Sequence, residues 1–206
     1  MHFFFFEKNF PIPSFFILFW FQILEILTQL EVLNLSNNQI QEIPSSLSKL
    51  LKLQSLDLSN NKIDDKSLIN ISDLIQLNVL NLSKNQIQEI PSSFSKLAQL
   101  QNLDLSNNKI NEKNINAISD LIQLKDLDLS NNQIQEISFS FSQLIQLQNL
   151  NLSDNKINDS IIQPISDLIQ KSREIQLIDL RGKSFSISIY LFIYLFIYLF
   201  IYLFIY

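Results

Sequence analysis

The stretch that decides the fold is "LQNLDLSNNKI", residues 100–110. Five other segments follow the same pattern, L-x-x-L-x-L-x-x-N-x-I, with their asparagines in register. The asparagines are Asn38, Asn61, Asn85, Asn108, Asn132 and Asn155, so successive copies are 23, 24, 23, 24 and 23 residues apart. A pattern that returns at this period predicts a repeat protein made of stacked coils.

Each copy alternates leucines such as Leu103 and Leu105 with polar residues. A period of two places the leucines on one face of a short strand and the polar residues on the other. One coil cannot bury such a face alone, whereas stacked coils form a continuous core beneath a parallel sheet. On the return side, apolar residues three apart, such as Ile71, Leu74 and Leu77, predict short helical turns. The expected fold class is therefore an α/β solenoid.

The pattern asparagine combines a donor and an acceptor in one side chain. A buried row of such amides can satisfy backbone groups where each strand turns away from the sheet. We therefore expect a structural role for Asn38, Asn61, Asn85, Asn108, Asn132 and Asn155.

The pattern resembles the leucine-rich repeat family over residues 30–170, and a degraded copy, "IQLIDLRGK", follows at 175–183. The resemblance implies a horseshoe segment with a concave parallel β-sheet and a convex side of short helices and turns. It also implies a non-catalytic scaffold or adaptor that binds proteins on its concave face, with regulatory work on a small GTPase or a phosphatase as one role.

Two classes of coil alternate, so the true unit is 47 residues, as 85 minus 38 and 108 minus 61 show. Coils such as "QIQEIPSSLSKL" are similar to intracellular signalling repeats of the Ras-group type. Coils with "ISDLIQL" are similar to the short phosphatase-regulator type. The likeness within each class indicates tandem duplication of a two-coil block.

Partner-binding candidates are the polar residues between the inward leucines, on the concave face. They are Asn34, Asp57, Asn81, Asp104, Asp126, Asp128, Asn151 and Asp179. Because parallel strands stack about 4.8 Å apart, Asp104 and Asp128 are expected to be like-charged neighbours that suit a basic segment of another protein. The alternative is that these residues only keep the surface soluble, since the face lacks the aromatic and arginine side chains common in binding hot spots.

Composition excludes several classes of function. The net charge is −5, and the longest basic cluster is a pair, which argues against a nucleic-acid partner. Without cysteine, with one histidine beside the start and with one glycine, the chain has no predicted metal site, cofactor or phosphate loop. Asp126 and Asp128 share one strand face and are the best pair for acid–base catalysis. Such chemistry needs a deep pocket, which an open groove does not offer, so we expect no enzyme.

The two ends differ from the repeats. We expect an apolar segment at 1–21, a leucine-rich repeat domain at 22–183 and a low-complexity tail at 184–206. Leu24, Leu27 and Leu30 have the convex spacing of the repeats and are expected to cap the first coil. The absence of cysteine-paired caps favours a cytoplasmic location.

The closing "IYLFIYLFIYLFIYLFIY", residues 189–206, leaves alternatives open. Eighteen apolar residues make about 27 Å of helix, close to the thickness of a bilayer core, so a membrane-associated protein is one hypothesis. The other is a translated AT-rich repeat, because ATTT repeated in frame encodes Ile-Tyr-Leu-Phe. A duplicated gene fragment without a specific function is then also conceivable.

Overall fold

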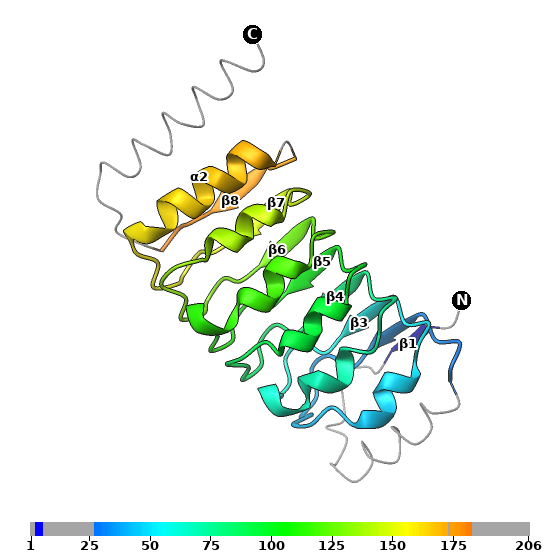
Figure 1. Ribbon diagram of the computed structural model, residues 1–206. Helices are drawn as coiled ribbons and strands as arrows, with labels where there is room; N and C mark the ends of the chain where they lie inside the picture. Colours follow the sequence, from blue (N-terminus) through cyan, green and yellow to red (C-terminus); the bar gives the residue numbers. More distant parts are fainter. Residues whose placement is uncertain (1–2, 6–26, 173, 183–206) are drawn as a thin grey trace.

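The computed structural model describes residues 3–5, 27–172 and 174–182. In this part of the chain, eight short parallel strands form one sheet in sequence order, with helical turns on the opposite side of each coil (Figure 1). The strands are β1 (Phe3–Phe5), β2 (Val32–Asn34), β3 (Ser55–Asp57), β4 (Val79–Asn81), β5 (Asn102–Asp104), β6 (Asp126–Asp128), β7 (Asn149–Asn151) and β8 (Leu177–Asp179). This arrangement confirms the predicted α/β solenoid.

The register follows the leucine pattern. The middle leucine of each strand pairs with the middle leucine of the next, as Leu80 does with Leu103 and Leu103 with Leu127. These leucines are at most 2% exposed, whereas the residues on either side of them face outward from the sheet. Strand residues 32 to 34 and their equivalents therefore present two parallel rows of side chains on the concave face.

Short 3-10 helices form most of the return side. They are η1 (Ser45–Lys49), η2 (Asp65–Ile71), η3 (Ser92–Lys96), η4 (Glu112–Asn114), η5 (Asn116–Asp120), η6 (Phe139–Gln143) and η7 (Asp159–Ile161). The two coil classes begin these helices differently. Pro44 and Pro91 precede η1 and η3, whereas Asp64 accepts a hydrogen bond from the N–H of Lys66 at the start of η2. Both devices suit a helix start, because proline fixes φ and an acidic side chain satisfies an unpaired N–H.

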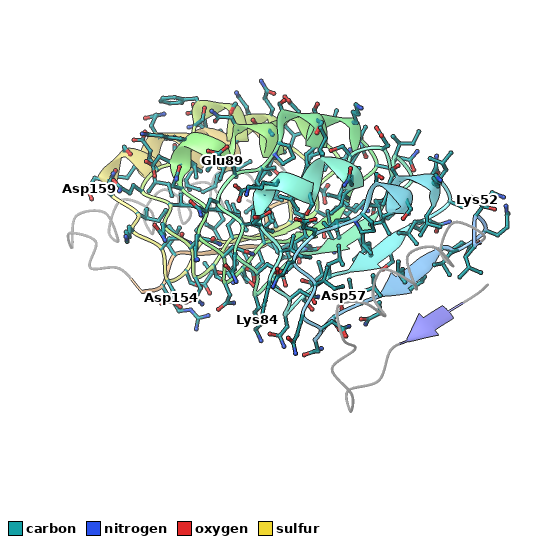
Figure 2. The ribbon with its side chains drawn as sticks, turned by 90° about the horizontal axis from the view of Figure 1, so that it is seen from below. Lys52, Asp57, Lys84, Glu89, Asp154 and Asp159 are labelled. Atoms are coloured by element: carbon teal, nitrogen blue, oxygen red, sulfur yellow. The ribbon has the colours of Figure 1, made fainter. Side chains whose placement is uncertain are left out.

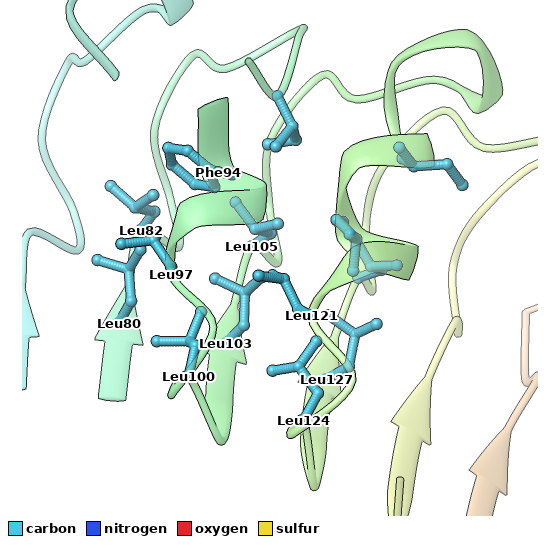
Figure 3. Packing of buried hydrophobic residues seen from close by; sticks show 14 of the residues in the cluster. Leu80, Leu82, Phe94, Leu97, Leu100, Leu103, Leu105, Leu121, Leu124 and Leu127 are labelled. Carbon is cyan, nitrogen blue, oxygen red and sulfur yellow. The ribbon is translucent and has the colours of Figure 1, made fainter. Parts of the chain in front are cut away.

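The core lies between the sheet and the helical turns. Figure 3 shows leucines of the strands, such as Leu80 and Leu103, packed against Phe94 and Leu97 of the return side. Phe94 is fully buried, as is Phe141 at the same position two coils later. The buried residues form one cluster that runs through the described coils. Each coil thus buries its apolar side against its two neighbours.

The last coil is longer than the others. Asn149 of β7 pairs with Leu177 of β8, which is 28 residues later, compared with 23 or 24 residues for the preceding coils. The extra length holds a ten-residue α-helix, α2 (Ile162–Lys171), where the sequence predicted only short turns. Pro164 is the third residue of this helix, where no intrahelical N–H bond is required.

The first strand was not predicted. β1 pairs with β2 in parallel, with Phe4 opposite Leu33. Phenylalanine favours strands, which is consistent with this pairing. Of the three leucines expected to cap the first coil, Leu30 is buried and Leu27 packs partly against the core. Leu24 lies outside the described residues.

The domain boundaries at 21/22 and 183/184 and the 189–206 segment also lie outside the described residues. Among the helices of residues 27–172 and 174–182, none combines the length and apolar content needed to cross a membrane.

Candidate protein-binding face

A groove of about 350 Å³ runs along the concave face from β4 to β8. Five of the eight predicted partner-binding residues line it: Asn81, Asp104, Asp126, Asp128 and Asn151. The other three share the face but lie outside that lining. Asn34 and Asp57 are on β2 and β3, and Asp179 is on β8 at the other end. Figure 2 shows Asp57 at the border of the solenoid away from the helical turns.

The row that ends each strand also shapes the turn that follows. In all seven coils, the Oδ1 atom of this Asn or Asp accepts the backbone N–H two residues later, at 2.8–3.1 Å. The residues are Asn34, Asp57, Asn81, Asp104, Asp128, Asn151 and Asp179. These side-chain turns explain the choice of Asn or Asp on structural grounds. The signal was visible as Asn/Asp-Leu-Ser in six copies, and the sequence reasoning missed it.

Asp126 is held between two amides. Its Oδ2 accepts from Asn102 Nδ2 at 2.7 Å, and its Oδ1 accepts from Asn149 Nδ2 at 2.5 Å. The three residues belong to β5, β6 and β7 and share one row. Both carboxylate oxygens of Asp126 are therefore engaged, so Asp126 is less available to a partner than a sequence pattern suggests.

Asp104 and Asp128 lie opposite each other in the register of β5 and β6. Asp128 also accepts a hydrogen bond through Oδ2 from Asn151 Nδ2 at 3.0 Å. Within the described part of the chain, the side chain of Asp104 makes its hydrogen bond through Oδ1 alone. Asp104 thus presents an oxygen to the groove beside a second carboxylate.

At the end of the sheet, Arg181 neutralises Asp179. The Nε and Nη2 atoms of Arg181 donate to Asp179 Oδ2 at 2.9 and 2.6 Å, and Nε also donates to Oδ1 at 3.0 Å. These side-chain hydrogen bonds lower the pKa of Asp179 from its usual value, against the opposing effect of burial. The ion pair removes Asp179 from the set of acidic groups that a basic partner could use.

The pattern asparagines lie at the turns after the strands, away from the groove. The five from Asn61 to Asn155 are at most 8% exposed. Each donates to a leucine carbonyl of its own coil and to one of the preceding coil, and accepts an isoleucine N–H of the preceding coil. Asn38 is half-buried and donates to Leu35 O and Ser36 O of its own coil. The row thus binds coil to coil through backbone groups.

The residue before each pattern asparagine has a positive φ. These residues are Asn37, Asn60, Lys84, Asn107, Asn131, Asp154 and Gly182, with φ between 52° and 88°. Asparagine and glycine tolerate this left-handed region best, which explains their frequency in the row. Gly182 fills the position in the degraded seventh copy.

Metal and catalytic chemistry find little support on this face. Across residues 3–5, 27–172 and 174–182, no group of three His, Cys, Asp or Glu side chains is placed to hold a metal ion. Asp126 and Asp128 share β6, but amide side chains already donate to both of them in an open groove.

Comparison with family models decides the classification. A model of leucine-rich repeats in two copies matches residues 28–70 and 122–169, and a second leucine-rich repeat model matches residues 69–110. The chain belongs to the leucine-rich repeat family. Leucine-rich repeats are in general protein-interaction modules, and solenoids of this kind bind through an extended concave surface. A comparison with curated proteins finds no match.

Solved leucine-rich repeat structures resemble the chain over three quarters of its length. An internalin from Listeria monocytogenes is 28% identical, with a TM-score of 0.66, and the match covers 76% of this chain and 42% of the internalin. The ectodomain of the Arabidopsis thaliana receptor kinase GASSHO1/SCHENGEN3, in complex with CASPARIAN STRIP INTEGRITY FACTOR 2, is 29% identical, with a TM-score of 0.66 and coverages of 76% and 19%.

The plant peptide hormone receptor RGFR1, in complex with RGF2, is 33% identical, with a TM-score of 0.63 and coverages of 76% and 25%. This chain therefore spans less than half the length of each of these three proteins.

Proposed function

We propose that this leucine-rich repeat chain is a non-catalytic scaffold or adaptor whose concave groove binds a basic segment of another protein. The observation that carries the proposal is the pairing of Asp104 with Asp128 across β5 and β6 inside the groove.

Electrostatics selects the partner's charge. Carboxylates on adjacent strands are about 4.8 Å apart and repel each other. No lysine or arginine is among the residues that line the groove. A lysine or arginine of the partner placed between Asp104 and Asp128 would relieve that repulsion and form charge-assisted hydrogen bonds.

The amides beside the acidic pair supply orientation. Asn81 on β4 and Asn151 on β7 flank Asp104 and Asp128 in the same row. Their amides can donate to and accept from the backbone of an extended segment that crosses the strands. Val79 and Leu177 add exposed apolar side chains at the two ends of the groove, at 40% and 56% exposure. A basic centre flanked by apolar residues is therefore the partner chemistry that fits best.

The structural relatives support a protein or peptide partner. Two of the plant receptors that the chain resembles are in complex with a protein factor or with RGF2. By analogy we extend this mode of use to the present chain, and we place its role in the cytoplasm as a regulator in signalling, on the basis of its cysteine-free composition and the two coil classes.

The test uses the full chain as bait in a cell lysate, with partners identified by mass spectrometry. The variant Asp104→Lys/Asp128→Lys reverses the charge of the groove. A matched control, Glu136→Lys/Asp159→Lys, makes the same change in net charge at exposed positions away from the groove.

We expect the groove variant to lose partners that both the parent and the control retain, while circular dichroism shows the same fold for all three. If the groove variant keeps every partner of the parent, the concave face is not the binding surface and the proposal fails.

A further inference from the structure

One exposed aliphatic residue recurs in each coil on the side where the chain returns to the sheet. The residues are Leu51, Ile75, Ala98, Ile122 and Ile145, at steps of 24, 23, 24 and 23. The leucine and the three isoleucines are 49–57% exposed, and Ala98 is exposed as well. Each follows a fully buried leucine directly, so the position is the same in every coil. We refer to these five residues as the aliphatic stripe.

A row of charges runs beside the aliphatic stripe, two residues earlier in each coil. It consists of Lys49, Asp73, Lys96 and Asp120, which alternate in sign along the solenoid. All four are exposed. Lys96 Nζ lies 2.9 Å from Asp73 Oδ1, with both side chains 57% exposed, which shows that side chains of adjacent coils are within reach of each other in this row. We refer to these four residues as the alternating row.

We propose that the aliphatic stripe is covered by a second copy of this chain in an antiparallel, two-fold arrangement. The alternating row selects the occupant, because its order of signs, plus, minus, plus, minus, becomes the complement of itself when reversed. A two-fold axis across the stripe, between Asp73 and Lys96, sets Lys49 against the second copy's Asp120 and Asp73 against the second copy's Lys96. Each charge then faces its opposite, as a self-complementary isologous interface requires.

The same axis matches the aliphatic residues. Leu51 faces the second copy's Ile122, and Ile75 faces the second copy's Ala98, so a large side chain meets a small one at the centre. Parallel alignment of two copies, coil against equal coil, sets lysine against lysine and aspartate against aspartate. That alignment is disfavoured because like charges at an interface repel. The antiparallel pairing is therefore the one that both rows permit.

The two-fold contact leaves the proposed binding groove open. None of the stripe residues lines that groove. A dimer of this kind would present two concave faces that run in opposite directions. The proposal therefore stands or falls independently of the basic partner proposed above.

The absence of cysteine from the sequence allows a direct test by cross-linking. Full chain with Ile75→Cys is mixed with differently tagged full chain with Ala98→Cys, and the mixture is oxidised mildly. We expect rapid formation of the disulfide-linked heterodimer. The control mixture pairs Ile75→Cys with Ile145→Cys, residues that the two-fold axis keeps several coils apart. Equal rates of cross-linking in the two mixtures would overturn the proposal.

A charge exchange provides the second test, by sedimentation equilibrium of the full chain. Asp73→Lys places lysine against the second copy's Lys96 and should weaken dimerisation about tenfold. The double variant Asp73→Lys/Lys96→Asp restores opposite charges and should recover the parent's dissociation constant. A monomeric parent overturns the proposal. Self-association that does not respond to Asp73→Lys also overturns it, since the contact then lies elsewhere in the chain.

Discussion

The side-chain oxygen of Asn108 accepts the backbone N–H of Ile87 at 3.0 Å, across the boundary between two coils. The Nδ2 atom of the same asparagine donates to the carbonyls of Leu82, in the earlier coil, and Leu105, in its own, both at 3.0 Å. Asn108 is 8% exposed. One side chain thus satisfies backbone groups of two coils where water has little access, and its loss leaves several of them unpaired.

Replacing Asn108 by alanine should therefore be costly. We expect Asn108→Ala to lower the free energy of unfolding by about 3 kcal/mol, because it leaves a buried N–H and buried carbonyls without partners. Urea unfolding followed by circular dichroism measures the change. The matched control is Asn38→Ala, since Asn38 is half-buried and its side chain donates to carbonyls of its own coil. Equal losses for the two variants would contradict the bridging role of Asn108.

Lys84 occupies a left-handed position, with φ of 56°, where three of the neighbouring coils have asparagine. A residue other than glycine or asparagine is strained in this region. Lys84→Asn should therefore raise the free energy of unfolding by about 0.5–1 kcal/mol, since the backbone conformation and the exposed position do not change. The reverse exchange, Asn107→Lys in the next coil, should lower it by a similar amount. A thermal shift of the same sign in both variants would argue against this explanation.

Phe139 and Phe141 test the core within one 3-10 helix, η6. Phe141 is fully buried, and Phe139 is 59% exposed. Phe141→Ala should lower the free energy of unfolding by about 3–5 kcal/mol through lost burial and a cavity. Phe139→Ala should change it by less than about 0.5 kcal/mol. Denaturant titration of both variants provides the measurement, and a large loss for Phe139→Ala would show that this side chain is covered in solution.

The ion pair of Arg181 and Asp179 predicts a pH dependence. The lowered pKa of Asp179 means that its carboxylate is favoured in the folded state. Its contribution to stability is therefore present above the unfolded-state pKa of about 3.9 and is lost as the pH falls through the lower folded-state value. We expect the parent to unfold at a higher temperature than Arg181→Gln at pH 7, with a difference that shrinks below about pH 4.

Thermal melts of the Arg181→Gln variant between pH 2 and pH 7 check this dependence. Lys109→Gln removes the same charge from another exposed position and controls for the change in net charge. A pH-independent difference between the parent and Arg181→Gln would indicate that the pair acts by packing and not by charge.

The alternation of leucines predicted the strands well, because burial on one face dictates a period of two. Each middle leucine, such as Leu56 or Leu127, lies at the centre of a strand. The sequence did not predict β1, since three phenylalanines are equally compatible with a strand and with other apolar structures. Nor did it predict α2, which depends on how a 28-residue coil fills the space that shorter coils leave to 3-10 turns.

The candidate face was less predictable than the fold. The sequence shows Asp126 and Asp128 as equivalent acids on one strand, but Asp126 accepts hydrogen bonds from Asn102 and Asn149 on both sides. Such contacts depend on side-chain conformations across strands that are 23 or 24 residues apart in sequence. Pattern reasoning places the residues in a row and does not tell which oxygen atoms are already engaged. The charges expected to attract a partner are consequently fewer than the sequence suggests.

The hydrogen bonds of the asparagine row connect each coil only with its immediate neighbour. Removal or addition of one complete 47-residue block would therefore recreate at the new junction the same pairs of donors and acceptors that it separated. Unequal recombination between blocks can then lengthen or shorten the groove without inventing a new interface. The length of such a chain is free to vary during evolution in a way that the length of a closed globular core is not.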